Sequence, residues 1–195
     1  MILFLTLGSK CHGRKPVGIY EDFVITRSVG LYARRPNLIS MRPPEKIRLD
    51  PSLYKVPGSV YFFTIISNFK KPYFVDENLN NEIVYCLKTE RERMKCKIYV
   101  FCLMPDHLHF LCGSNNCGVS VLDVVNQFKG KSTRIGWKYG IKGSLWQRRS
   151  YDHILRKEED LEETSKYIVK NPVRRGIVEE WDKYPFSGYL DNFDL

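Results

Sequence analysis

The sequence predicts an α+β domain with a ferredoxin-like βαββαβ antiparallel sheet and one added C-terminal helix. Short runs rich in β-branched and aromatic residues alternate with longer segments whose apolar residues recur at helical spacing. A Pro-Asp pair between two of the short runs predicts a hairpin. The resulting order is strand, helix, strand, strand, helix, strand, helix. We expect an antiparallel sheet with its helices on one face.

The first predicted strand covers residues 59–66, a run too short and too rich in β-branched and aromatic residues for a helix. Residues 76–95 form the first predicted helix, with cations in its last turns where the helix dipole favours them. The hairpin follows, with strands at residues 97–102 and 107–112 on either side of Pro105-Asp106.

The second half of the order begins with a predicted helix at residues 121–138, whose apolar residues share one face. Residues 151–156 form a short fourth strand. The last predicted helix opens with acidic residues at its positive end and carries Tyr167. It should end at Asn171, because Pro172 disfavours helical geometry in the residue before it. Residues 181–189 should pack as a tail against the sheet.

Residues 1–57 read as a poorly structured basic N-terminal extension, and residues 58–195 as the folded domain. The extension holds six prolines, ten Lys and Arg and four acidic residues, with little sustained periodicity. Such an arm could add non-specific phosphate contacts. The alternatives are an extension without a role, or a true start at Met41.

A net charge of +9 indicates a polyanionic partner, although a ribosome-associated or membrane-surface protein would share that charge. The six cysteines form no Cys-x-x-Cys pair, and four lie in apolar runs, which is typical of buried free thiols in a reducing compartment. No run resembles a signal peptide or a membrane span. We therefore expect a cytoplasmic protein without a membrane partner.

Two short clusters carry the predicted chemistry. His107 and His109 stand two residues apart, so strand alternation places both imidazoles on one face, where they suit a divalent metal ion. An accidental pair is the alternative for these two residues alone. Tyr167 and Asn171 are one helical turn apart. A phenol can attack a phosphodiester, and an amide oxygen can supply a third metal ligand.

Three motifs, in this order and spacing, carry a family resemblance: Met-Pro-Asp-His-Leu-His, Leu-Trp-Gln-Arg-Arg with Tyr-Asp-His-Ile shortly after, and Tyr-Ile-x-x-Asn-Pro-Val-x-x-Gly-Ile-Val. Over residues 58–189 the chain resembles the HUH single-tyrosine transposases that act on single-stranded DNA, and most closely the REP-associated tyrosine transposases. We expect Mg²⁺ or Mn²⁺ as the cofactor, held by His107, His109 and Asn171. The resemblance implies a 5′-phosphotyrosine intermediate. It also implies single-stranded DNA with a hairpin as partner, and a monomer or homodimer.

Basic and aromatic residues are interleaved between Asp123 and Asp152, a stretch without an acidic residue. Cations that follow a phosphate backbone and rings that stack on unpaired bases would form a single-strand platform. The predicted DNA-binding residues are Lys129, Lys131, Arg134, Lys138, Lys142, Trp146, Gln147, Arg148 and Arg149. Alternatively, Trp137 and Trp146 belong to the core, and Gln147 caps a turn.

Two residues next to these motifs stay outside the predicted site. Asp106 reads as a turn residue, and His153 either reaches the phosphate or is satisfied by the backbone. Two other functions fit the same fold, since a fold does not fix a function. One is a domesticated DNA-binding protein that no longer moves DNA. The other is an RNA-binding ferredoxin-like module whose histidines are structural.

Overall fold

The computed structural model describes residues 50–56, 58–113, 119–155 and 158–192. Residues 1–49, which make up most of the predicted extension, lie outside the described residues. The prediction for that segment therefore stays a prediction.

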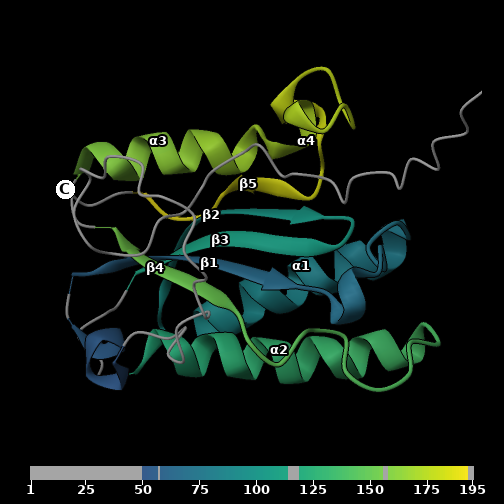
Figure 1. The fold of residues 1–195 in the computed structure, drawn as a ribbon, viewed down its shortest axis with the longest axis horizontal. Helices are drawn as coiled ribbons and strands as arrows, with labels where there is room; N and C mark the ends of the chain where they lie inside the picture. Colours follow the sequence, from purple (N-terminus) through teal and green to yellow (C-terminus); the bar gives the residue numbers. More distant parts are fainter. Residues whose placement is uncertain (1–49, 57, 114–118, 156–157, 193–195) are drawn as a thin grey trace, which may run out of the picture. The chain divides into compact units, whose positions relative to one another are not determined.

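An antiparallel five-stranded sheet, in the order β4-β1-β3-β2-β5, is the centre of the fold (Figure 1). Its strands are β1 (Val60–Ile66), β2 (Lys97–Met104), β3 (His107–Gly113), β4 (Tyr151–Leu155) and β5 (Ser187–Tyr189). The first four strands have the order and directions of a ferredoxin-like sheet, which confirms the predicted fold class. Arg156, the predicted last residue of the fourth strand, lies outside the described residues.

β1 and β3 are neighbouring inner strands, and their pairing sets the register of the site. They pair antiparallel, with Phe63 opposite Phe110 and Thr64 opposite His109. The rings of Phe63 and Phe110 stack 5.3 Å apart, and both side chains are buried. Because a one-residue slip would turn every side chain to the other face, this apolar pairing also fixes which face carries the histidines.

The helices are α1 (Glu77–Arg93), α2 (Val121–Lys138), α3 (Glu158–Val169) and the single turn α4 (Asn171–Arg174). Asp76 begins α1 by accepting a hydrogen bond from the backbone N–H of Leu79 at 2.9 Å. Ser120 begins α2 by accepting one from Leu122 at 3.3 Å. α3 ends at Val169, two residues before the predicted position, and Pro172 then stands in the first turn of α4.

The expectation that all helices share one face of the sheet is wrong. Figure 1 shows α1 and α2 on one side of the strands and α3 on the other. The ring of Tyr167 on α3 lies against Phe62 and His109, so α3 covers the histidine face. That face also carries Val100 and Leu111, both 0% exposed, and it needs an apolar cover as much as the opposite face does.

Residues 51–55, assigned to the extension by the sequence, belong to the folded unit instead. They form a 3₁₀ turn in which the side chain of Tyr54 is 0% exposed. Its hydroxyl donates a hydrogen bond to Asp152 of β4 at 2.5 Å, and its ring stacks on Tyr61 at 5.8 Å. These contacts of Tyr54 show that the folded domain begins before residue 58, the predicted start.

The C-terminal tail packs on the sheet as predicted and also extends it. β5 pairs with the edge of β2, and the hydroxyl of Tyr184 donates a hydrogen bond to the carbonyl of Leu103 at 2.7 Å. Cys86, Cys96, Cys102 and Cys112 are buried free thiols, as their apolar surroundings indicated. In the described ranges, every helix is too short or too polar to cross a membrane.

Candidate active site

Both predicted metal-binding histidines lie at the start of β3, directly after the Pro105-Asp106 turn. Their side chains share one face of the sheet, with ring centroids 4.5 Å apart and ring planes at 74°. His109 lies opposite Thr64 of β1 and Cys102 of β2, while His107 lies opposite Ile66 and Met104. Alternation along the strand thus brings the two imidazoles together as the sequence predicted.

The Nδ1 atom of each imidazole already has a partner from the protein. Thr64 Oγ1 lies 2.8 Å from Nδ1 of His109, and Asp106 Oδ1 lies 2.6 Å from Nδ1 of His107. When Nδ1 carries the proton and donates to that oxygen, the lone pair is on Nε2. Histidine ligands are commonly held through their second nitrogen in this way. The pair therefore fits a divalent ion bound through two Nε2 atoms.

His109 is also placed to stay neutral. Its side chain is 7% exposed, and burial lowers its pKa well below the ordinary value, with further lowering by the charges of His107, Arg174 and Arg175. A metal ligand must be the neutral imidazole, because protonation removes the lone pair that binds the ion. At neutral pH the ring of His109 is ready for coordination without losing a proton first.

Tyr167 lies near the C-terminal end of α3, close to the histidine pair. Its ring centroid is 6.1 Å from that of His109, and it meets the ring of Phe62 edge-on at 6.5 Å. The guanidinium carbon of Arg174 lies 4.4 Å above the Tyr167 ring. The phenol predicted as the nucleophile is thus packed between the sheet and a cation from α4.

Asn171 is joined to the site through Tyr167. Its side chain is buried, and Nδ2 donates a hydrogen bond to the carbonyl of Tyr167 at 3.2 Å. The amide could therefore bind a metal ion through Oδ1. In the described part of the chain, no group of three or more His, Cys, Asp or Glu side chains is placed to hold a metal. The predicted donor set, two imidazoles with one amide oxygen, therefore stays a prediction.

The predicted DNA-binding residues do not form one surface, because α2 packs on the side of the sheet opposite α3 (Figure 1). Lys129 of α2 donates to the carbonyls of Gln147 and Arg148 at 2.7 and 3.1 Å, which ties the helix to the loop that follows it. Lys138 pairs with Glu82 of α1 at 3.3 Å. Arg134 is exposed on the same helix. The α2 cations thus lie away from the histidine face.

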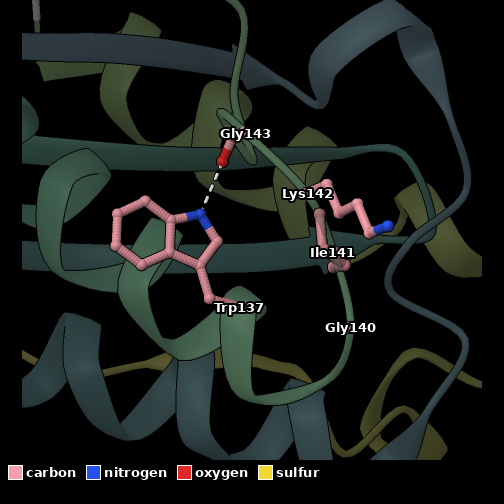
Figure 2. A pocket seen from close by; sticks show the side chains of 5 residues that line it. All are labelled: Trp137, Gly140, Ile141, Lys142 and Gly143. Carbon is pink, nitrogen blue, oxygen red and sulfur yellow. Dashed lines mark hydrogen bonds between the residues drawn. The ribbon is translucent and has the colours of Figure 1, made fainter.

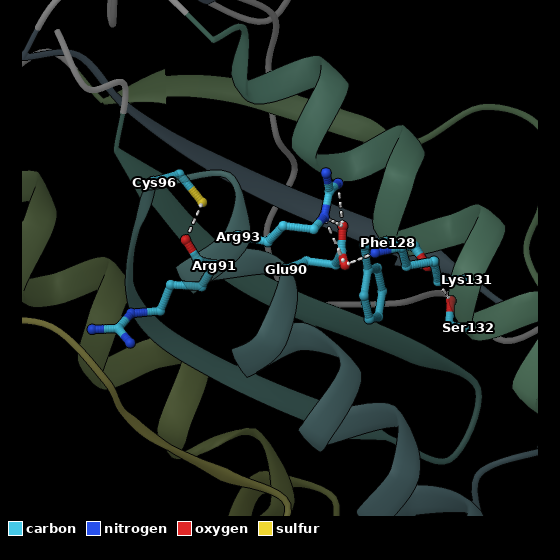
Figure 3. A network of polar contacts seen from close by, with 7 residues as sticks. All are labelled: Glu90, Arg91, Arg93, Cys96, Phe128, Lys131 and Ser132. Carbon is cyan, nitrogen blue, oxygen red and sulfur yellow. Dashed lines mark hydrogen bonds and ion pairs between the residues drawn. The ribbon is translucent and has the colours of Figure 1, made fainter. Parts of the chain in front are cut away.

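Lys131 has a structural partner that the sequence did not reveal. Its ammonium pairs with Glu90 of α1, whose side chain is 1% exposed, and Arg93 reaches the same carboxylate at 2.6 Å (Figure 3). Burial alone would raise the pKa of Glu90, but the hydrogen bonds and charges of Arg93 and Lys131 outweigh it and hold the pKa below its usual value. Lys131 is therefore a link between α1 and α2.

The prediction that Trp146 stacks on DNA bases is wrong, and the core alternative holds. Trp146 is 1% exposed and stacks on Phe74 with ring centroids 4.9 Å apart. Its Nε1 donates to Ser132 Oγ at 2.7 Å. Trp137, by contrast, is 55% exposed and donates from Nε1 to the carbonyl of Gly143 at 2.7 Å, beside Lys142 (Figure 2).

Gln147, Arg148 and Arg149 lie at the end of the sheet that carries the site. The backbone N–H of Gln147 donates to the carbonyl of Ile66 at 2.9 Å, and Ile66 is the register partner of His107. Both arginines are exposed. Among the predicted DNA-binding residues, this loop is the group best placed for a strand that enters the site.

Three residues at the site were not among the predicted site residues. Thr64 and Asp106 hold the histidines, and Arg174 covers Tyr167. Thr64 does interrupt an otherwise apolar strand, and Arg174 lies two residues after the Asn-Pro pair. The positions of these two residues in the sequence do not show which side chain each one contacts in the fold.

Comparisons with known proteins give the same class as the fold and the site. The family model described as "Transposase IS200 like" matches residues 55–171, more than half of the chain. Proteins of this class are DNA strand transferases. The chain belongs to the IS200-like transposase family.

Individual relatives within that family are REP-associated tyrosine transposases. One from Haemophilus influenzae, described as putative, is 28% identical over 143 residues, covering 68% of this chain and 80% of the relative. One from Escherichia coli K12 is 24% identical over 140 residues, covering 70% and 79%. These relatives confirm the resemblance drawn from the three motifs.

A solved structure of a REP-associated tyrosine transposase bound to a REP hairpin has the same fold. It superposes with a TM-score of 0.60 at 21% identity and covers 75% of this chain and 82% of that one. The likeness supports the ferredoxin-like sheet with its added helix.

Proposed function

We propose that this transposase cleaves and rejoins single-stranded DNA beside hairpin sequences, through a 5′-phosphotyrosine intermediate formed by Tyr167. The observation that carries the proposal is the 6.1 Å separation between the rings of Tyr167 and the buried His109. A phosphate bound between these two side chains would lie next to both the nucleophile and a metal ligand. The hairpin substrate is inferred from the motif resemblance and from the transposase that was solved with a REP hairpin.

His107, His109 and the Oδ1 atom of Asn171 are the proposed ligands of a Mg²⁺ or Mn²⁺ ion. When bound, the ion would draw charge from the oxygens of the scissile phosphate. Asp106 and Thr64 hold the imidazoles so that both Nε2 atoms are available. Asn171 holds the last turn of the tyrosine helix through the Tyr167 carbonyl, so one side chain would serve both the ion and the nucleophile.

In the proposed reaction, the phenol oxygen of Tyr167 forms a bond to phosphorus while its proton passes to solvent. The bond between phosphorus and the 3′-oxygen breaks, and that oxygen leaves as a 3′-hydroxyl after taking up a proton. Arg174 holds the phenol ring from above. Because the new phosphodiester keeps the energy of the old one, a second 3′-hydroxyl can reverse the step and join different ends.

The test uses the full chain, Mn²⁺ and a hairpin oligonucleotide labelled on the 3′ side of the cleavage site. Wild-type protein should give a labelled adduct that survives boiling in detergent, and EDTA should abolish it. Tyr167→Phe should bind the oligonucleotide and give no adduct. Tyr151→Phe is the matched control, since this ring also lies 6.5 Å from Phe62 and should be dispensable.

Other outcomes would assign other functions. Cleavage without an adduct, retained in Tyr167→Phe, would indicate a metal-bound water as nucleophile. DNA binding without any cleavage would favour a domesticated DNA-binding protein. Metal-independent binding of RNA in preference to DNA would favour the RNA-binding module.

A further inference from the structure

The loop that follows β1, residues 67–71, presents an aromatic side chain to solvent between basic neighbours. Phe69 is 79% exposed, and Lys70 and Lys71 after it are also exposed. Burial of a phenylalanine side chain stabilises a folded protein. This loop does not bury the ring of Phe69. None of the chemistry proposed above uses Phe69.

The backbone of this loop is held in an unfavourable conformation. Phe69 and Lys70 have φ angles of 57° and 55°, in the left-handed region that glycine, asparagine and aspartate occupy more readily. Side chains with a Cβ atom are strained there. Two consecutive strained residues persist only where the surrounding structure determines them, and such residues cluster at functional sites.

Hydrogen bonds within the loop, and one to Leu145 outside it, supply that constraint. The buried Ser67 donates from Oγ to the carbonyl of Lys71 at 2.6 Å. The backbone N–H of Asn68 donates to the carbonyl of Leu145 at 2.8 Å, and that of Lys70 to the carbonyl of Ser67 at 3.0 Å. The backbone is therefore fixed while the ring of Phe69 stays outside the core.

The loop also adjoins the turn that begins the histidine strand. The backbone N–H of Ser67 donates to the carbonyl of Asp106 at 2.8 Å, and that of Phe74 donates to the carbonyl of Pro105 at 3.0 Å. Ile66, the last residue before the loop, is the register partner of His107. A DNA strand with its phosphate at the histidines would pass this loop within a few nucleotides.

We propose that Phe69 stacks on an unpaired base next to the scissile phosphate, while Lys70 and Lys71 contact the phosphates beside that base. Exposed rings with neighbouring cations are the usual platform for single-stranded nucleic acid, because every base has a flat face and every linkage a negative charge. Because the loop backbone is already fixed, little conformational entropy of the loop would be lost when the ring stacks on a base. The inference rests on the proposed function for the position of the strand.

The experiment measures binding in the Tyr167→Phe background, so that no measurement depends on cleavage. The probe is a DNA hairpin with a single-stranded extension that carries 2-aminopurine beside the cleavage site, compared with the same hairpin without its extension. Loss of the ring in Phe69→Ala should weaken binding of the extended probe by about 5- to 150-fold and reduce quenching of 2-aminopurine. Binding of the blunt hairpin should stay within about twofold.

Two further variants separate stacking from a general loss of structure. Phe69→Trp should restore both affinity and quenching, since it keeps a flat ring. Tyr85→Ala removes an aromatic side chain that is 72% exposed on α1 and should change neither. Wild-type affinity in Phe69→Ala, or equal losses on both probes, would overturn the inference. Absence of an adduct in the wild-type protein would overturn the proposed function and leave the Phe69 result standing.

Discussion

Thr64 Oγ1 lies 2.8 Å from Nδ1 of His109, so a hydroxyl on β1 determines which nitrogen of the neighbouring imidazole faces the site. His107 has a carboxylate, Asp106, in the same role at 2.6 Å. In the proposed metal site, the two nitrogens that would bind the ion are thus set by one residue on the neighbouring strand and one in the turn. A partner of this kind changes the affinity for metal without touching the ion.

Thr64→Val keeps the shape of the side chain and removes the hydroxyl. The affinity for Mn²⁺ should fall about 10- to 100-fold, because the imidazole of His109 no longer has the partner that fixes its orientation. Titration of Mn²⁺ followed by the electron paramagnetic resonance of the free ion measures this change. Thr64→Ser should recover most of the affinity. Thr89→Val on α1, where the hydroxyl meets the carbonyl of Tyr85, should bind Mn²⁺ as the wild type does.

Arg174→Gln removes the cation 4.4 Å above the ring of Tyr167. If Arg174 acts through the ring alone, the single-turnover rate of adduct formation should fall about two- to fivefold, as for an exposed cation–π contact. If it also touches the phosphate during transfer, the loss should approach about 100-fold. Its exposed position on α4 makes contact with the phosphate possible, so we expect the larger effect.

Arg174→Lys separates these two roles, because it keeps the charge and loses the planar stack. It should retain more activity than Arg174→Gln if charge at the phosphate matters. Equal rates for the wild type and Arg174→Gln would remove Arg174 from the reaction.

The sequence predicted the strand and helix order because each element has a strong local pattern. The alternation around His107 and His109, and the helical spacing of Tyr167 and Asn171, are also local. The contacts that join distant segments were not predictable in this way. Nothing near Lys131 in the sequence indicates that it meets Glu90, forty-one residues earlier. A basic run therefore looked like a DNA surface, although part of it holds two helices together.

Trp146 illustrates the same limit for aromatic residues. In the sequence it is flanked by Leu145 and Gln147 next to two arginines, a context that fits either a core or a stacking platform. Its place in the core depends on Phe74, in the turn before α1, and on Ser132 of α2, which the chain brings together from two other segments. Tyr54 was missed for a related reason, since its partner Asp152 lies ninety-eight residues away.

Glu90→Gln tests the link between α1 and α2 through the pH dependence of stability. Because Arg93 and Lys131 hold the pKa of Glu90 below the ordinary 4.5, its ionised form stabilises the fold above that pH. That contribution is lost as the pH falls through the lowered pKa. The variant should lower the free energy of unfolding at pH 7 by about 1–3 kcal/mol.

Urea unfolding at pH 7 and near the ordinary pKa of glutamate measures this effect. The difference between Glu90→Gln and the wild type should shrink at the lower pH, because Glu90 of the unfolded wild-type chain begins to take up a proton there while the folded carboxylate stays ionised. Glu163→Gln on the exposed side of α3 should follow the wild-type curve. An undiminished difference at low pH would mean that packing rather than charge makes Glu90 important.

The last prediction concerns which cations carry the DNA. Arg148 and Arg149 are exposed in the loop where Gln147 bonds to Ile66, whereas Lys131 is paired with a buried carboxylate on the other side of the sheet. Changing both arginines to Gln should lower the slope of log affinity against log salt by about 1 for each phosphate that the protein no longer neutralises. Lys131→Gln should leave that slope unchanged and lower the midpoint of thermal unfolding instead. Fluorescence anisotropy of a hairpin oligonucleotide at several salt concentrations, together with thermal melts, separates the two effects. A reduced slope in Lys131→Gln with normal stability would place the DNA along α2 after all.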